Sequence, residues 1–257
     1  MHQDLSKILH SFDPITLPEM DSVKLLDRTD TKFVFNYSKL PQVLSNLYSH
    51  YKILDVNGVR ENRYETLYFD TEGFKLYLDH HNGRNNRYKV RYRKYVDSDL
   101  VFFEVKYKNS RGRTLKSRVK RSSIEESIQG KSMELIKEKT PLSPQTLKAK
   151  FWVNYSRITL VNKVTTERLT LDLDLTFKNG QQQQGYGNLV IAEVKQEKLG
   201  ASHFLNVMKE NRVREGSISK YCFGVLSLVT GVKKNNFKPN LLYVNKMSYE
   251  TIDKTAA

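Results

Sequence analysis

Basic side chains recur at alternate positions in several segments of this 257-residue chain. The segment RYKVRYRKY, residues 87–95, places Lys89, Arg91 and Arg93 on one face of an extended strand, because successive side chains of a strand point to opposite sides. A guanidinium group can bind two phosphate oxygens at once, so arginine is well suited to phosphate recognition. The pattern therefore indicates phosphate chemistry on one face of a sheet.

The same alternation continues in the strand-like segments that follow. Their charged faces carry, in chain order, Glu104, Lys106 and Lys108; Lys116, Arg118 and Lys120; Tyr155 and Arg157; Arg168, Thr170, Asp172 and Asp174; Glu193 and Lys195. The opposite faces are apolar. An ordinary antiparallel sheet would turn such charged faces to water. A sheet curled into a barrel would line its lumen with them and bury its apolar faces under helices.

Two of the basic strands also carry a carboxylate, Glu104 in FEVKYK and Glu193 in AEVKQE. Acidic and basic groups on one strand face can be simple cross-strand ion pairs. They are also the groups that a metal-bound polyphosphate requires, because cations neutralise phosphate oxygens and carboxylate oxygens bind Mg²⁺ or Mn²⁺. The residues themselves leave both interpretations open.

The overall charge points to a polyanionic partner. Lys and Arg number 43 against 28 Asp and Glu, a net charge of +15. Such an excess indicates nucleic acid, an anionic membrane surface or a phosphorylated small molecule. The single cysteine, Cys222, excludes an intramolecular disulfide and a cysteine-based zinc cluster. Without a secretory signal or an apolar run of membrane-spanning length, we expect a cytoplasmic protein with no integral membrane segment.

We expect one α+β domain over residues 1–257, with its core at about 25–230 and a peripheral tail at 231–257. The His80-His81 pair precedes Asn-Gly and is expected in a solvated turn. The alternating segments predict strands at 31–36, 62–71, 86–96, 100–109, 112–121, 152–161, 167–177 and 188–197, with a hairpin loop at 178–188. Helical spacing predicts helices at 38–48, 73–83, 122–140, 201–213 and 217–230.

Seven blocks of the chain match a known family in order. They are LDRTDTKFVF, YETLYFDTEGFKLYLDHHNGRNNRYKVRYRKY, FFEVKYKNSRGRTLKSR, NYSRI, ERLTLDLDL, VIAEVKQE and SISKY. Together, over residues 25–225, they resemble the VTC domain, the polyphosphate-polymerase branch of the triphosphate tunnel metalloenzymes. The resemblance implies a closed antiparallel β-barrel whose basic lumen, surrounded by helices, binds triphosphate or polyphosphate with a divalent metal, Mn²⁺ or Mg²⁺.

Carried over by position, the resemblance assigns roles to individual residues of this chain. The expected catalytic residues are Lys32, Arg91, Arg93, Lys106, Arg157, Arg168 and Lys220. The expected phosphate-binding residues are Lys116, Arg118, Tyr155, Lys195 and Ser219. The expected metal ligands are Glu193 and Glu104. Hydrolytic relatives open with an E-x-E-x-K motif, but this chain reads DRTDTK, which favours the polymerase branch.

We therefore expect a polyphosphate polymerase that transfers the γ-phosphate of ATP to a growing inorganic polyphosphate chain. One alternative is a hydrolase of tripolyphosphate or nucleoside triphosphates on the same fold. A second is a protein that binds polyphosphate without turning it over. A third is a nucleic-acid-binding domain, because basic tracks with interleaved tyrosines hold single strands. Carboxylates on the same strand faces would repel a nucleic-acid backbone, so no DNA partner is expected.

Overall fold

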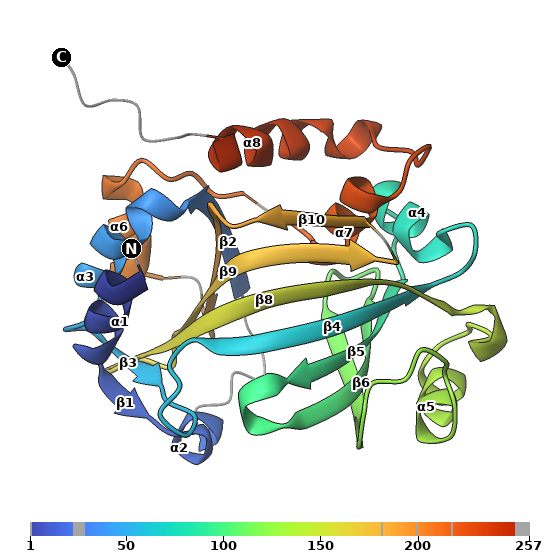
Figure 1. Cartoon of the computed structure of the whole chain (residues 1–257), viewed down its shortest axis with the longest axis horizontal. Helices are drawn as coiled ribbons and strands as arrows, with labels where there is room; N and C mark the ends of the chain where they lie inside the picture. The colour runs from blue at the N-terminus through green and yellow to red at the C-terminus, as the bar shows by residue number, and fades with distance from the viewer. Residues whose placement is uncertain (1, 23–28, 181, 199, 217, 250–257) are drawn as a thin grey trace.

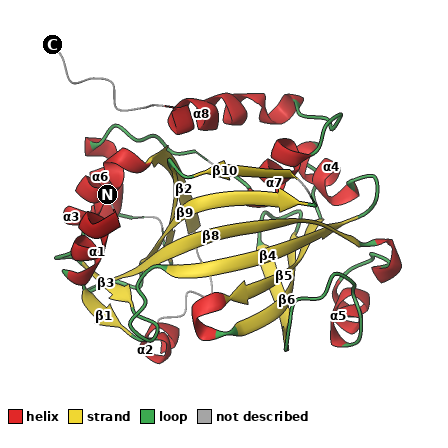
Figure 2. Cartoon of the chain, viewed as in Figure 1, coloured by secondary structure: helices red, strands yellow, loops and turns green. Residues whose placement is uncertain are grey.

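The computed structural model of the protein describes residues 2–22, 29–180, 182–198, 200–216 and 218–249. Figure 2 shows strands in the middle and helices around them. The strands are β1 (Asp13–Ile15), β2 (Thr29–Asn36), β3 (Tyr51–Leu54), β4 (Asn62–Asp70), β5 (Arg87–Tyr95), β6 (Leu100–Lys108), β7 (Thr114–Arg121), β8 (Lys148–Asn162), β9 (Arg168–Asn179), β10 (Gln182–Tyr186) and β11 (Leu189–Gln196). The helices are α1 (His2–His10), α2 (Leu17–Ser22), α3 (Leu40–Ser45), α4 (Lys75–His81), α5 (Lys131–Lys139), α6 (His203–Glu210), α7 (Lys220–Leu228) and α8 (Lys238–Tyr249).

All the strands belong to a single curved sheet (Figure 1). Its main path runs β2-β11-β9-β8-β4-β5-β6-β7, and each neighbouring pair along it is antiparallel. The predicted meander β5-β6-β7 is therefore confirmed. Strand β10 adds a hairpin partner to β9 where the sequence predicted only a loop, and β3 pairs with β8 and in parallel with β1.

The sheet is not closed into a barrel, so that part of the predicted fold is wrong. Within the described residues β2 and β7 do not pair. The outer edge of β2 is occupied instead: the Gly216 amide donates to the Lys32 carbonyl at 2.9 Å, and the Tyr243 hydroxyl donates to the Val34 carbonyl at 2.8 Å. A closing strand would need these acceptors. Alternation along a strand predicts which side chains share a face, but not which strand covers an edge.

One face of the sheet is buried under helices at the left of Figure 1. The side chains of Leu169, Leu171 and Leu173 point to this face and pack in one cluster with residues of α1, α3 and α6. The alternation LTLDL predicts this outcome, because it gives β9 one apolar side. We call the opposite face, which carries Arg91, Arg157 and Glu193, the inner face.

Helix α7 packs across one end of the inner face. Gly224 is required there, because a Cβ atom at this position would lie 2.3 Å from Cε2 of Phe151 and 2.9 Å from Cδ1 of Phe177. Tyr221 of the same helix donates a hydrogen bond to the buried carboxylate of Asp70. The apolar middle of α7 therefore closes this end of the inner face, and its N-terminus points toward the basic side chains.

The Asp70 carboxylate connects three elements. Asp70 is the last residue of β4. Its carboxylate accepts hydrogen bonds from the backbone N–H groups of Leu76 and Tyr77 at 2.9 and 3.0 Å, and so caps the first turn of α4. Burial raises the pKa of Asp70, and the hydrogen bonds from Tyr221 and the α4 backbone oppose this effect. Asp70 therefore fixes both α4 and α7 against the sheet.

A β-bulge in β9 changes which side chains reach the inner face. Asn154 pairs with Thr176 and Ser156 with Leu173, so two β9 residues, Asp174 and Leu175, lie opposite Tyr155. Asp174 has φ 51° and is exposed. Its predicted position on the charged face with Asp172 is therefore wrong, and Leu175 packs on the inner side instead. Strict alternation cannot predict an inserted residue.

Two other segments differ from the sequence prediction. The helix predicted at 122–140 begins only at Lys131. Residues 238–249 form α8, where a peripheral tail was expected. Its Val244 is 1% exposed and packs in the same cluster as Val34 and α7. The spacing of Leu241, Val244 and Met247 places them on one side of a helix, and this spacing could have predicted α8 from the sequence.

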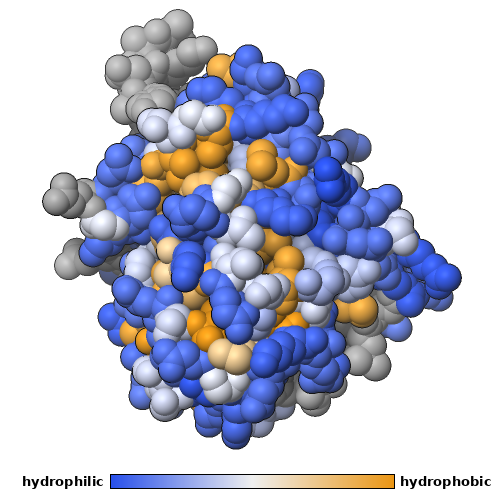
Figure 3. All heavy atoms as spheres, turned by 90° about the vertical axis from the view of Figure 1, so that its right-hand side faces the viewer, coloured by the Kyte–Doolittle hydropathy of each residue, from blue (hydrophilic) through white to orange (hydrophobic). Residues whose placement is uncertain are grey.

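The surface is largely polar, as expected for a chain with net charge +15. Figure 3 shows the face at the right of Figure 1, where hydrophilic side chains surround scattered apolar patches. Within the described residues, no helix is long and apolar enough to cross a membrane.

Candidate phosphate-binding site

The inner face brings together predicted basic residues from strands β5, β6 and β7 and from strands β2 and β11. Arg91 lies opposite Tyr68 on one side and Glu104 on the other, and Lys106 lies between Lys89 and Lys116. Strand β11 carries Glu193 beside Lys32 of β2. The two groups of strands interact electrostatically across the inner face, because Glu193 affects the pKa of Lys106 and Lys32 affects that of Lys89.

Arg91 is held by a buried carboxylate. Its Nε and Nη2 atoms lie 2.8 and 2.6 Å from Oε2 of Glu104, and its Nη1 donates to the Tyr68 hydroxyl at 3.0 Å. Lys116 of β7 forms an ion pair with the other Glu104 oxygen. Burial alone would raise the pKa of Glu104, but Arg91, Arg93 and Lys116 together hold it well below its usual value. Glu104 therefore stays ionised and fixes the orientation of Arg91.

A second fixed cluster joins β8, β9 and α7. Arg157 binds Asp172 through Nε–Oδ1 at 2.5 Å and Nη2–Oδ2 at 2.9 Å, and Lys220 at the start of α7 binds the same carboxylate. Burial would raise the pKa of Asp172, but Arg157 and Lys220 lower it to about 2. The cluster thus ties the N-terminus of α7 to the sheet and points two cations along the inner face.

Glu193 has only lysines as ion-pair partners among the described residues. Lys195 Nζ lies 2.8 Å from Oε2, and Lys32 Nζ lies 3.6 Å from Oε1. Burial opposes ionisation, but these two lysines hold the pKa of Glu193 well below its usual value. Mg²⁺ and Mn²⁺ sites that include substrate phosphates commonly use only one or two carboxylates. Glu193, with its loosely held Oε1, fits that role.

Two lysines of the inner face lack such a partner. In the described part of the chain, no carboxylate lies within ion-pair distance of Lys106 or Lys89; Lys89 Nζ contacts the Ser219 hydroxyl at 3.0 Å. Burial lowers the pKa of both lysines, and Arg91 and Arg93 lower that of Lys106 further. Basic side chains therefore outnumber carboxylates at this point of the inner face.

The excess charge reaches helix α4. The Nδ1 atom of His80 is buried and has no hydrogen-bond partner among the described residues. Burial, with Lys89, Arg87 and nearby cations, lowers the pKa of His80 to about 3. Its neighbour His81 is 2% exposed and is contacted by Asn236. The prediction of a solvated turn for the pair is wrong, because both residues lie in α4 and Asn236 and Phe237, just before α8, pack against them.

The aromatic residues of the inner face pack against its arginines. Tyr64 and Tyr155 stack with centroids 5.0 Å apart, and the Arg93 guanidinium lies 5.6 and 5.9 Å from their centroids. The buried Tyr155 hydroxyl has no hydrogen-bond partner within the described ranges. Burial raises the pKa of Tyr155, so this hydroxyl is a neutral group next to the cations.

The structure places the predicted residues at different depths. Arg91, Arg93 and Tyr155 are buried, and Ser219 caps α7 by accepting the Cys222 amide. Arg168 lies at the far end, where Nη2 donates to the Met20 carbonyl at 3.0 Å. The exposed predicted residues are Lys116 and Arg118 of β7. Residues 27 and 28 of the DRTDTK motif lie outside the described residues.

Three residues of the site were not predicted from the sequence. Asp172 and Lys89 share the charged faces of their strands, but neither was given a role in the site. Tyr68 contacts Arg91 from β4. Strand alternation alone could have identified Lys89, since it lies two residues from Arg91 and therefore on the same face. The role of Asp172 depends on its register opposite Arg157, which the sequence does not specify.

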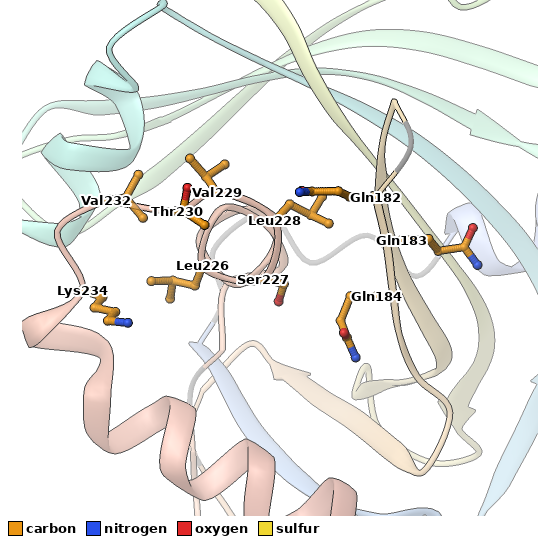
Figure 4. A pocket seen from close by; sticks show the side chains of 11 residues that line it. Gln182, Gln183, Gln184, Leu226, Ser227, Leu228, Val229, Thr230, Val232 and Lys234 are labelled. Atoms are coloured by element: carbon orange, nitrogen blue, oxygen red, sulfur yellow. The ribbon is translucent and has the colours of Figure 1, made fainter.

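A pocket of about 460 Å³ lies at the other end of α7 (Figure 4). It is lined by residues 182–184 of β10, the last turn of α7 and the loop that follows. Lys234 is the only cation among its described lining residues, and the carbonyl end of a helix carries partial negative charge. This pocket is poorly suited to a polyanion, unlike the inner face.

Fold and site together define an α+β protein with a curved, mainly antiparallel sheet whose inner face is basic. The family model described as VTC domain matches residues 27–229. The chain therefore belongs to the VTC domain family.

Comparison with curated proteins finds no match. Among solved structures, the chain is similar to a putative adenylate cyclase from Bacillus halodurans, with 14% identity, 75% of this chain and 94% of that chain covered, and a TM-score of 0.48. It is also similar to a putative adenylyl cyclase from Hippeastrum described as having a dominant triphosphatase activity, with 14% identity, coverage of 80% and 98%, and a TM-score of 0.48.

Proposed function

We propose that this protein is a polyphosphate polymerase whose inner face binds ATP and a growing inorganic polyphosphate chain. The observation that carries the proposal is that no carboxylate in the described residues pairs with the buried basic side chains of Lys106 and Lys89. Clustered cations in a partly desolvated site attract phosphate more strongly than exposed cations do. Bound phosphates would supply the missing negative charge.

The residues divide by the kind of contact that they can make. Arg91 and Arg157, fixed by their carboxylates, would bind phosphate oxygens with defined orientation. Lys89, Lys106 and Ser219 would contact the part of the polyphosphate that lies nearest to α7. The remaining cations of the inner face and its edge would bind further phosphates: Lys32, Arg93, Lys116, Arg168, Lys195 and Lys220. Glu193 would hold Mg²⁺ or Mn²⁺, which would neutralise charge on the phosphate oxygens.

The transfer requires little covalent chemistry from the protein. A terminal oxygen of the chain forms a bond to the γ-phosphorus of ATP, the bond from that phosphorus to the β–γ bridging oxygen breaks, and ADP leaves. The attacking oxygen is already anionic, so no general base is required. Fixed cations such as Arg91 and Arg157 stabilise the charge on the transferred group and align the reactants. Glu104 would hold the Arg91 guanidinium in the orientation that this contact requires.

One observation favours a second candidate function. Helix α7 closes one end of the inner face at Phe151 and Phe177, and this would limit the length of chain that can lie there. A hydrolase of tripolyphosphate or nucleoside triphosphates needs room for only three phosphates, with water as the attacking group. A polymerase would instead need room for a longer chain, so the product must decide between the two functions.

The experiment is incubation of the purified protein with ATP and Mn²⁺, followed by a gel that separates polyphosphate chains from phosphate. The variants are Lys106→Met and Glu193→Gln, with Lys178→Met as the matched control, because Lys178 is an exposed lysine of the same sheet. A ladder of chains that only the control retains would support the polymerase. Phosphate without chains would identify the hydrolase. Neither product from the wild type would contradict both.

A further inference from the structure

Four aromatic rings form a row across the inner face. Tyr155 of β8 stacks on Tyr64 of β4 with centroids 5.0 Å apart, and Tyr64 meets Tyr95 of β5 at 5.0 Å. Tyr95 contacts Phe102 of β6 edge-on at 6.0 Å. Because the four strands are neighbours in the sheet, the row runs perpendicular to them.

The exposure of the rings changes along the row. Tyr155 and Tyr64 are 4% and 7% exposed, and Arg93 and Arg157 lie over both of them. Tyr95 and Phe102, at the other end, are half-buried. The buried end therefore packs against the phosphate-binding cations, whereas the outer end is accessible to a ligand.

Phe102 is the unusual member of the row. It lies on the charged side of β6, opposite Arg93 and Lys120 and two residues from Glu104. An apolar ring at a half-exposed position on a charged strand face gains little from burial. The guanidinium of Arg118, an exposed residue, lies 4.4 Å from the Phe102 centroid. The guanidinium therefore covers one face of the ring, and this stacked pair offers a flat surface at the edge of the basic site.

Such a surface suits a flat conjugated ligand. Arginine and aromatic rings both stack on nucleobases, and this stacking tolerates any base because every base has a π face. A strand advances about 7 Å for every two residues, so a ligand on Phe102 is one such step from Glu104 and Arg91 and two from Lys106. That order would put a base at the lip and the phosphates toward α7.

We propose that Phe102 and Arg118, with Tyr95 beside them, bind the base of the nucleoside triphosphate donor. This inference rests on the proposed function and adds what distinguishes the donor from the growing chain. Inorganic polyphosphate has no ring and gains nothing from this surface. The surface would therefore favour a nucleotide over inorganic polyphosphate at this end of the site. Stacking without hydrogen-bond readout predicts similar affinities for ATP and GTP.

The test is calorimetric binding of ATP and of inorganic tripolyphosphate, each with Mg²⁺, to matched variants. Phe102→Leu removes the ring and keeps an apolar side chain. Tyr107→Leu is the control, because Tyr107 is a half-buried aromatic residue of the same strand on the opposite face. Phe102→Trp keeps a stacking surface and is expected to retain ATP affinity. Melting curves check that each variant is folded.

Phe102→Leu is expected to weaken ATP binding by about 5- to 150-fold, the range for loss of one base stack, and to change tripolyphosphate binding by less than twofold. The control is expected to change neither. Equal losses for both ligands, or an unchanged ATP affinity, would overturn the inference alone, provided that the wild type binds tripolyphosphate. A wild type that binds neither ligand would overturn the proposed function and this inference together.

Discussion

Two groups of cations on the inner face have opposite surroundings. Arg91 and Arg157 each bind a buried carboxylate through two nitrogens. Lys106 and Lys89, close to them, have no carboxylate within ion-pair distance in the described part of the chain, and burial lowers their pKa values. The first group is stable without a ligand. The second destabilises the empty protein and leaves positive charge free for an anion.

This difference separates the two arginines, which carboxylates hold in a fixed orientation, from the two lysines, which are available to bind an anion. Removing one partner of a buried ion pair costs about 3–5 kcal/mol, because the other charge remains buried and unpaired. Removing a buried charge that has no partner relieves desolvation and repulsion instead. The two groups should therefore respond to mutation with opposite signs in stability, and both should lose phosphate binding.

The largest effect is expected from breaking the Asp172 cluster. Asp172→Asn leaves Arg157 and Lys220 without their carboxylate, and we expect the free energy of unfolding to fall by about 3–5 kcal/mol. Chemical denaturation measures the change. Asp174→Asn is the control, since this exposed residue is two positions away and asparagine tolerates its positive φ. Similar stabilities for the two variants would contradict the assignment.

The complementary variant is Lys106→Met. Loss of one charge-assisted contact should weaken tripolyphosphate binding by about 1.5–3 kcal/mol, measured by calorimetry. The melting temperature of the empty protein should rise, because a desolvated cation beside Arg91 and Arg93 is removed. Lys178→Met should alter neither quantity. A fall in melting temperature for Lys106→Met would show that this lysine has a stabilising partner.

The closed end of the inner face is tested by Gly224→Ala. The added methyl group would meet the ring of Phe151 in the core, and such overpacking costs about 1–3 kcal/mol. Thermal unfolding measures the loss. Gly187→Ala is the comparison, because a Cβ atom there meets nothing within 4 Å. Equal melting temperatures for the two variants would mean that α7 does not pack tightly on the sheet.

The smallest predicted effect is proton uptake on binding. Bound phosphate should raise the lowered pKa values of Lys106 and Lys89, so protons lost by the empty protein are regained. Uptake should be largest at pH values between the lowered pKa values of the empty protein and the raised values of the complex, and it should vanish well above the ordinary lysine pKa of about 10.4. Calorimetry in buffers of different ionisation enthalpy measures it. Uptake that is unchanged in Lys106→Met would assign the protons to other groups.

The same two lysines determine how the stability of the empty protein depends on pH. Their folded pKa values lie below the unfolded value, so the unfolded state binds more protons in the interval between them. Stability should therefore rise with pH across that interval. Denaturant midpoints measured at pH 7 and 9 should show the increase, and it should be smaller in Lys106→Met.

Much of the site could be predicted from the sequence, because strand alternation fixes which side chains share a face. The charged faces of β5, β6 and β11 follow directly from that rule. The bulge at Asp174 and the role of Asp172 could not be predicted, since both depend on the register between β8 and β9. The unclosed sheet could not be predicted either. It depends on Gly216 and Tyr243, which occupy the edge of β2 from distant parts of the chain.

The most direct test of the account is the melting temperature of the wild-type protein in increasing concentrations of inorganic tripolyphosphate. If the inner face has cations in excess, the ligand should stabilise the folded state by about 2.7 kcal/mol at one hundred times its dissociation constant, and the midpoint should keep rising with concentration. Lys106→Met should shift much less at the same concentrations. A wild-type midpoint unmoved by millimolar tripolyphosphate would contradict the account.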